Sequence, residues 1–382
     1  TRHDVKAVEY LIGEYLEAAA GKLGEGTTLP SLREVVHIFC TSEDINNLAY
    51  ALTIKAATEQ VWLPAIRALL DRLRGLAEAG AAVPMLAHTH GQPATPVTVG
   101  KEMAVFAHRL SRQITRVEAT EYLGKINGAT GTWAAHVVSV PGADWPTLTR
   151  SFVEGLGLTW NPLTTQIESH DWQAELYSDV ARAGRIAHNL ATDAWTYISM
   201  DYFHQNLAAQ GSTGSSTMPH KVNPIRFENA EANLEVSNAL LDSLASTLVT
   251  SRMQRDLTDS TTQRNVGVAL GHAVLAYDNL VRGLDGIEIN AARMAQDLDA
   301  NWAVLGEAVQ QAMRAAAIAG ATGMANPYER LKELTRGHEV GERDMREFIA
   351  GLGLPAEVEE RLLALTPATY VGLSERLARW EA

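Results

Sequence analysis

The segment GSTGSSTMPHKVNP, residues 211–224, contains the residue types that most directly suggest chemistry. Its glycines and hydroxyl residues are followed by a lysine, an asparagine and Pro224, and proline is common in the first turn of a helix. Backbone N–H groups, an ammonium group and a helix N-terminus would then face one anion. The pattern predicts an anion-binding loop, although its composition alone is equally typical of a flexible Ser/Gly linker.

The core of this segment, GSSTMPHKVNP, resembles the signature GSSxMPxKxNP of the aspartase/fumarase superfamily. The resemblance implies that Ser215 is the general base, which removes a proton from the carbon beside a carboxylate. It also implies that Lys221 and Asn223 bind that carboxylate and that Met218 lies at the substrate. Proton removal there creates a doubly charged aci-carboxylate, so fixed positive charge and N–H dipoles are needed where the charge develops. The ammonium and N–H groups would also lower the pKa of the serine hydroxyl enough for it to act as a base.

A second group of polar residues lies in HTHGQPATP, residues 88–96. Taken alone, a histidine in such a loop more often has a structural role. The resemblance implies that His90 is the general acid that protonates the leaving nitrogen and that Thr89 contacts the substrate. A neutral amine leaves more easily than an amide anion, and an imidazolium can supply the proton at neutral pH. Glu228 occupies the position of the superfamily's glutamate partner of this histidine, and the less favoured alternative is a surface helix acid.

The residue before the catalytic lysine distinguishes the branches of this superfamily. Fumarases and aspartases carry a small residue there and argininosuccinate lyases carry glutamine, whereas this chain has His220, which indicates the purine branch. Other segments are similar to the same branch, namely TRHDVKAVEY, CTSEDINNLAYAL, LGKINGATG, TTQIESHD, SRMQRDLTDSTTQRN and NPYERLKELTRG. The similarity to the longer bacterial form of this branch covers nearly the whole chain, and it implies β-elimination of fumarate from succinylated purine nucleotides.

Further substrate-binding positions follow from the resemblance, residue by residue. Those implied for the ribose phosphate or the succinyl end are Arg2, His3 and Asp4, with His3 orienting the phosphate. The others are Thr41 and Ser42 for a carboxylate, Gln166 for the succinyl group, Asn229 for the substrate, and Arg255, Ser260 and Arg264 for the nucleotide and its phosphate. Without the family, Thr41 and Ser42 could be helix caps, and Arg255 and Arg264 could belong to a solvated helix end.

Long helices are expected to position these residues. Stretches rich in Ala, Leu, Glu and Arg predict helices over 43–80, 98–121, 171–207, 223–250 and 263–286. Gly, Pro, Ser and Thr gather between them and predict loops over 84–97, 124–146 and 208–224. The pattern predicts an all-α fold with a bundle of long helices, and the resemblance implies the aspartase/fumarase-type arrangement.

Three domains are expected. Residues 1–35 are the remainder of an N-terminal domain, because the opening sequence already reads as a helix in progress. The arginine–tyrosine pair that helps family members bind the phosphate also has no counterpart before Thr1, so we expect a truncated N-terminus. Residues 36–286 form the central bundle with the catalytic loops, and residues 287–382 form a small C-terminal helical domain with shorter helices.

Composition limits the partners and the compartment. Among 382 residues, 32 Lys and Arg against 45 Asp and Glu give a net charge of −13, which argues against a general binder of nucleic acid or of membrane surfaces. The single cysteine, Cys40, cannot form an intrachain disulfide, and no Cys/His ligand set for zinc is present in the sequence. No window is apolar enough for a membrane span. A cytoplasmic protein is expected.

The resemblance implies a homotetramer with no metal or organic cofactor. Its active sites would combine residues 88–92, 211–229 and 251–264 from different subunits, with a nucleotide as the small-molecule substrate. Three alternatives remain open at this point: a related lyase such as argininosuccinate lyase, a structural protein on the same scaffold, as in some lens crystallins, and an inactive fragment of an enzyme.

Overall fold

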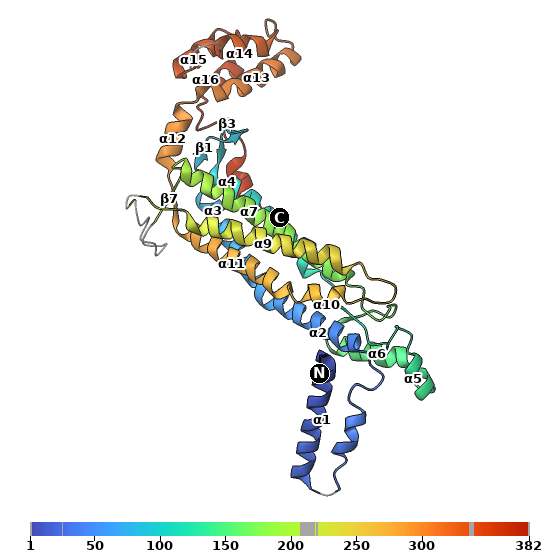
Figure 1. Cartoon of the computed structure of the whole chain (residues 1–382). Coiled ribbons are helices and arrows are strands. Elements are labelled where there is room, and N and C mark those ends of the chain that lie inside the picture. The colour runs from blue at the N-terminus through green and yellow to red at the C-terminus, as the bar shows by residue number, and fades with distance from the viewer. Residues whose placement is uncertain (1, 25, 207–217, 219–220, 336–339, 381–382) are drawn as a thin grey trace. The chain divides into compact units, whose positions relative to one another are not determined.

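The computed structural model of the chain is built mainly from long helices (Figure 1). It describes residues 1–382 except 1, 25, 207–217, 219–220, 336–339 and 381–382. The long helices are α1 (Asp4–Leu23), α2 (Ser42–Ala57), α3 (Leu63–Ala79), α4 (Val99–Glu118), α7 (Asp171–Ser199), α9 (Ile225–Leu248) and α11 (Val266–Asp285). The prediction of an all-α fold is confirmed, because every strand in the described residues has only two or three residues.

The shorter helices lie mostly toward the C-terminus. They are α5 (Ala134–Ser139), α6 (Trp145–Gly155), α10 (Thr258–Gln263), α12 (Ala291–Asp299), α13 (Gly306–Ile318), α14 (Pro327–Thr335), α15 (Glu342–Ala350), α16 (Ala356–Leu363) and α17 (Ser374–Ala378). The described residues also contain two 3-10 helices, η1 (Leu29–Glu34) and η3 (Trp302–Leu305), and one π-helical turn, η2 (Thr58–Trp62). Because η2 joins α2 to α3 without a break, the predicted helix over 43–80 is continuous but contains a π turn.

The strands form four small two-stranded pairs. Antiparallel pairs join β1 (Pro84–Met85) to β4 (Val97–Thr98), β2 (His88–Thr89) to β3 (Gln92–Pro93), and β7 (Phe203–Gln205) to β8 (Ile287–Ile289), whereas β5 (Leu123–Gly124) and β6 (Thr159–Trp160) are parallel. The predicted loop over 84–97 is therefore a short β-hairpin, and the one over 124–146 contains α5. The helix predicted over 171–207 ends earlier, at Ser199, because Asp201 adopts a left-handed φ of 61° and the chain continues into β7.

The described chain divides into two compact units made of interleaved segments. The first contains Thr1–Ile66, Gln113–Arg185 and Ala232–Leu275, and the second contains Arg67–Arg112, Ile186–Glu231 and Ala276–Ala382. These units do not test the division at residues 35 and 286, which stays a prediction. None of the described helices is long and apolar enough to cross a membrane.

A buried ion pair holds the first unit together at the start of α2. Lys125 Nζ lies 2.8 Å from Asp44 Oδ1, and both side chains have no exposed surface. Asp44 also accepts backbone N–H bonds from Thr41, Asn127 and Gly128 at 2.9–3.1 Å. Burial lowers the pKa of Lys125, although the Asp44 carboxylate beside it acts in the opposite direction. The carboxylate thus joins the N-terminus of α2 to the segment that follows β5.

Small residues and polar contacts pack the long helices of the first unit closely. A Cβ on Gly184 of α7 would lie 2.3 Å from Asn238 Oδ1 of α9, so only glycine permits this approach. Ser237 Oγ donates to the carbonyl oxygen of Ala269 at 2.8 Å, and Asn233 Oδ1 lies 2.7 Å from His272 Nδ1, so α9 is bonded to α11 at two points.

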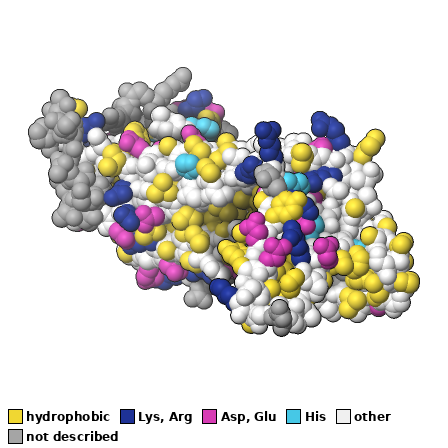
Figure 2. Space-filling model, turned by 60° about the horizontal axis from the view of Figure 1, so that its bottom comes forward, with side chains coloured by type: hydrophobic (Ala, Val, Ile, Leu, Met, Phe, Trp, Pro, Cys, Tyr) yellow, Lys and Arg dark blue, Asp and Glu magenta, His cyan; other side chains and the backbone are white. Residues whose placement is uncertain are grey.

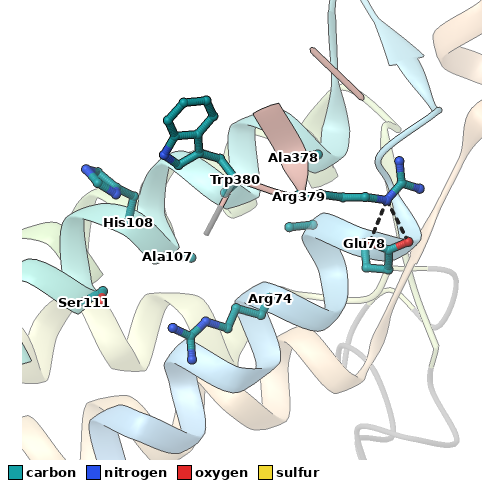
Figure 3. A pocket seen from close by; sticks show the side chains of 10 residues that line it. Arg74, Glu78, Ala107, His108, Ser111, Ala378, Arg379 and Trp380 are labelled. Carbon is teal, nitrogen blue, oxygen red and sulfur yellow. Dashed lines mark hydrogen bonds and ion pairs between the residues drawn. The ribbon is translucent and has the colours of Figure 1, made fainter. Parts of the chain in front are cut away.

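The second unit contains the C-terminal helices. Trp302, Val309, Met313, Met345 and Ile349 belong to one buried cluster formed by η3, α13 and α15. The last helix, α17, borders a cavity of about 650 Å³ together with α3 and α4 (Figure 3). There Arg379 Nε lies 2.9 Å from Glu78 Oε2, and this ion pair links the residue after α17 to α3.

The buried pair predicts an asymmetric effect of mutation on stability. Asp44→Ala should lower the free energy of unfolding by about 3–5 kcal/mol, because it leaves a buried ammonium and removes the acceptor of three backbone N–H groups. Lys125→Met should cost less, because Asp44 keeps those N–H bonds. Urea unfolding at one protein concentration measures both. An equal or larger loss for Lys125→Met would show that the backbone bonds to Asp44 contribute little.

Candidate active site

Polar residues of the first unit surround a cavity of about 400 Å³ at the starts of α1 and α2. Seven of the residues predicted from the sequence line it, namely Arg2, His3, Asp4, Ser42, Arg255, Ser260 and Arg264. They come from three distant parts of the chain, which α1, α2 and α10 bring together. Counted with Glu43, which also lines the cavity, three arginines face two carboxylates, so the pocket has a formal net charge of +1 and suits an anion.

His3 connects the first two helices at this pocket. Its Nδ1 accepts the backbone N–H of Lys6 at 3.3 Å, which caps α1. In a neutral imidazole the other nitrogen then carries the proton. His3 Nε2 lies 3.3 Å from Ser42 Oγ, so it can donate to this hydroxyl. This arrangement fixes the position of His3 relative to the start of α2.

Arg255 is held between two side chains. Its Nη2 lies 2.8 Å from Glu43 Oε1, and its Nη1 donates to Gln166 Oε1 at 3.3 Å. Gln166 in turn donates from Nε2 to the carbonyl oxygen of Ala129 at 3.1 Å. The predicted residues Arg255 and Gln166 are therefore in contact. Because Glu43 balances the charge of Arg255, the net charge available to an anion comes from Arg2 and Arg264 against Asp4.

Glu43 is a residue of this pocket that the sequence did not predict. The structure buries it to 4% exposure, and Asn46 Nδ2 donates to it at 3.0 Å. The only signal in the sequence was its position directly after two residues predicted to bind substrate. Thr41 lies at the N-cap of α2, where its backbone N–H donates to Asp44, and it is not among the residues that line the cavity.

Buried polar side chains around His170 hold the backbone of Ser260 in position. Asp259 Oδ1 accepts the backbone N–H of Ser260 at 2.6 Å, and its other oxygen lies 3.3 Å from His170 Nε2. Gln173 and Gln263 also lie within hydrogen-bond distance of the His170 ring. His170 was not predicted, because nothing in the sequence distinguishes it from a core histidine. The cluster fixes the start of α10, where Ser260 lies.

The second unit contains the predicted acid. His90 and Gly91 form the two-residue turn between β2 and β3, with φ values of 54° and 72°. Two successive positive φ values are characteristic of a type I′ hairpin turn. Glycine adopts this backbone readily, whereas histidine does so at a cost, and such strain is typical of functional positions. The turn presents His90 and its neighbour Thr89 to solvent.

The start of α9 carries the other predicted groups of this unit. Lys221 N donates to the carbonyl oxygen of Met218 at 3.0 Å, and Gln205 Nε2 donates to that of Val222 at 2.8 Å. The carbonyl group of Val222, which lies between Lys221 and Asn223, is thus hydrogen-bonded to Gln205 of β7. Pro224 precedes the helix directly, as its residue type predicts.

The predicted carboxylate partner of the acid lies one turn into α9. Glu228 Oε1 accepts a hydrogen bond from Trp195 Nε1 at 3.2 Å, and Asn229 follows it on the exposed surface of the same helix. The predicted base, Ser215, and His220 lie outside the described residues.

The predicted residues thus divide between the two units. The first unit holds Arg2, His3, Asp4, Thr41, Ser42, Gln166, Arg255, Ser260 and Arg264, whereas the second holds Thr89, His90, Met218, Lys221, Asn223, Glu228 and Asn229. Within the described part of the chain, no group of three or more His, Cys, Asp or Glu residues is arranged to hold a metal ion.

Two family models match the chain. The model described as "Lyase" matches residues 1–238, and the one described as "Adenylosuccinate lyase C-terminal" matches residues 251–371. The adenylosuccinate lyase of Escherichia coli K12 is 50% identical over 97% of this chain and 78% of its own length. That of Vibrio cholerae is 48% identical over 99% of this chain and 80% of its own length.

Solved structures share the fold at lower identity. A fumarate lyase from Mesorhizobium sp. BNC1 superimposes with a TM-score of 0.76 at 21% identity, covering 99% of this chain and 83% of its own. A 3-carboxy-cis,cis-muconate lactonizing enzyme from Pseudomonas putida gives a TM-score of 0.71 at 22% identity, covering 98% and 79%. The predicted aspartase/fumarase-type fold is confirmed.

The hairpin turn gives a prediction with a matched control. Gly91→Ala should lower the free energy of unfolding by about 1–2 kcal/mol, because an L-residue is disfavoured at its φ of 72°. Gly142→Ala should change it by less than about 0.5 kcal/mol, since Gly142 has no positive φ. In both cases the new methyl group would meet no atom within 4 Å. Thermal unfolding of both variants measures the difference, and equal stabilities would contradict the assigned turn.

Proposed function

The chain belongs to the adenylosuccinate lyase family of the fumarase superfamily, and we propose that its two groups of site residues perform the reaction of that family. It is a carbon–nitrogen lyase. It eliminates fumarate from adenylosuccinate to give AMP, and from succinylaminoimidazole carboxamide ribotide to give the free carboxamide ribotide AICAR, in purine nucleotide biosynthesis. About half of its residues are identical to those of curated enzymes over nearly its whole length, and this observation favours adenylosuccinate lyase over argininosuccinate lyase.

The proposed reaction needs one base, one acid and a site for developing charge. Ser215 removes the proton from the carbon beside a succinyl carboxylate, and the electron pair of that bond moves into the carboxylate. Lys221 and Asn223 stabilise the resulting aci-carboxylate. The electron pair then returns to form the double bond of fumarate, the C–N bond breaks, and His90 protonates the leaving nitrogen. Each of these steps is acid–base chemistry by side chains.

The pocket of the first unit binds the nucleotide in this proposal. Its excess of arginine over carboxylate suits a phosphate, and Arg2 and Arg264 provide the charge that Glu43 does not balance. His3 and Ser42, already linked to each other, orient the phosphate or a carboxylate of the succinyl group. Gln166 and Arg255 contact the rest of the substrate from their shared network.

We propose that the enzyme is a homotetramer whose sites combine residues of different subunits. Several long helices expose large hydrophobic side chains, namely Val105, Ile225, Val236, Val268 and Leu275. Figure 2 shows hydrophobic side chains between charged ones on the face that it draws. Burying such side chains against another subunit is favourable.

Because Cys40 is the single cysteine of the chain, a disulfide within it is impossible, and we place the enzyme in the cytoplasm.

Release of fumarate tests the activity and the two central roles. Wild-type protein should release fumarate from adenylosuccinate and from the carboxamide ribotide, but not from argininosuccinate. Ser215→Ala and His90→Gln should each lower kcat by about 10²–10⁴ while substrate still binds, because each removes one proton transfer. His88→Gln is the control, since His88 is a neighbouring exposed histidine without an assigned role. A Ser215 or His90 variant with near wild-type kcat would contradict its role.

Mixing inactive variants tests the shared site. Homotetramers of the His90 variant and of the Ser215 variant each lack one group at every site. If the two loops of one site come from different subunits, subunit exchange creates some sites with both groups intact. About a quarter of the wild-type activity is the maximum for random exchange in a closed symmetric oligomer. Verified exchange without recovered fumarate release would show that both residues act from one chain.

A further inference from the structure

Trp195 is a residue of α7 to which the proposed mechanism assigns no role. Its indole Nε1–H donates to Glu228 Oε1 of α9 at 3.2 Å. One turn earlier on α7, Thr192 Oγ1 donates to Glu231 Oε1 of α9 at 2.6 Å. Two donors on α7 thus face two carboxylates on the first turns of α9.

The two bonds differ in the role of the carboxylate that accepts them. The superfamily resemblance makes Glu228 the carboxylate partner of His90, whereas it gives Glu231 no part in the chemistry. A donor bonded to a carboxylate restricts a side chain that otherwise has many rotamers. The indole N–H is a donor only and does not titrate, so it restricts Glu228 without adding a charge beside it.

We propose that Trp195 is a positioning residue, which orients the carboxylate of Glu228 so that Glu228 can pair with the imidazole of His90. The inference rests on the proposed roles of Glu228 and His90. An ionised carboxylate has about four lone-pair sites on two oxygens, so a bond from Trp195 at Oε1 is compatible with one from an imidazolium. Trp195 acts through Glu228 and does not touch the substrate.

Trp195→Phe removes the N–H and keeps an aromatic side chain, and its effect should appear in the pH profile. A less ordered Glu228 pairs less well with the protonated form of His90. The alkaline limb of the kcat profile should therefore move to lower pH by about 0.5 unit, which corresponds to a roughly threefold loss of kcat on that side. KM should change little, because the nucleotide pocket is untouched.

Thr192→Val is the matched control, because it removes the equivalent bond to Glu231 between the same two helices. Its pH profile should match that of the wild type. An equal shift in this variant would overturn the inference and assign the effect to helix packing. If Trp195→Phe does not fold, 3-benzothienylalanine at position 195 keeps the shape of the indole without its N–H, and the same shift is expected.

Glu228→Gln separates failure of the inference from failure of the proposed function. It should move the alkaline limb further than Trp195→Phe does, and adding Trp195→Phe to it should cause no additional shift. An unchanged limb in Glu228→Gln would refute the role of Glu228, and with it the inference. A shifted limb in Glu228→Gln with an unchanged one in Trp195→Phe would refute the role of Trp195 alone.

Discussion

The pocket of the first unit that we propose for the nucleotide depends on the carboxylate of Asp44. This group is fully buried, pairs with Lys125 and accepts three backbone N–H groups. Contacts that start at Asp44 continue into the pocket and return to it as a closed ring. In order of contact, the ring passes through Asp44, its neighbour Glu43, Arg255, Gln166, the carbonyl group of Ala129 and the N–H group of Gly128, which donates to Asp44. A buried charge is costly unless its partners are all in place, so the ring has one favourable arrangement. Arg255 and Gln166 are thereby set in position before any substrate binds, which reduces the ordering cost of binding.

The groups proposed for chemistry are supported in another way. His90 lies at the exposed tip of a hairpin, and Lys221 and Asn223 lie in the non-helical chain directly before α9. Backbone geometry, rather than burial, determines where they lie: a type I′ turn for His90, and the bond from Gln205 to Val222 for the other two. Exposed positions of this kind suit residues that must meet a substrate and, in the proposed tetramer, residues of another subunit.

The sequence was sufficient to predict the long helices because their composition and length are unambiguous. It placed the start of α9 correctly from Pro224, but it extended α7 too far, since the left-handed turn at Asp201 has no glycine to signal it. Motifs located seven of the residues that line the cavity of the first unit. The sequence did not predict Glu43 and Lys125, the charged residues that hold the pocket together. Glu43 lies in helix-like sequence and Lys125 in loop-like sequence, and only the tertiary structure shows that both are buried and paired.

The residues proposed for binding and those proposed for chemistry lie in different units, and this separation also explains where a titrating group can be tolerated. A histidine that exchanges protons in every cycle changes its charge, and each change inside a ring of buried charges would disturb all of its members. Such a group is better located outside the ring, with a partner that does not itself titrate in the working range. Glu228, the proposed partner, lies outside the ring, and the indole of Trp195 donates to its carboxylate without adding a charge of its own. A lysine or arginine in place of Trp195 would compete electrostatically with an imidazolium for Glu228, whereas the neutral indole adds no charge that would compete in the proposed pairing of Glu228 with His90.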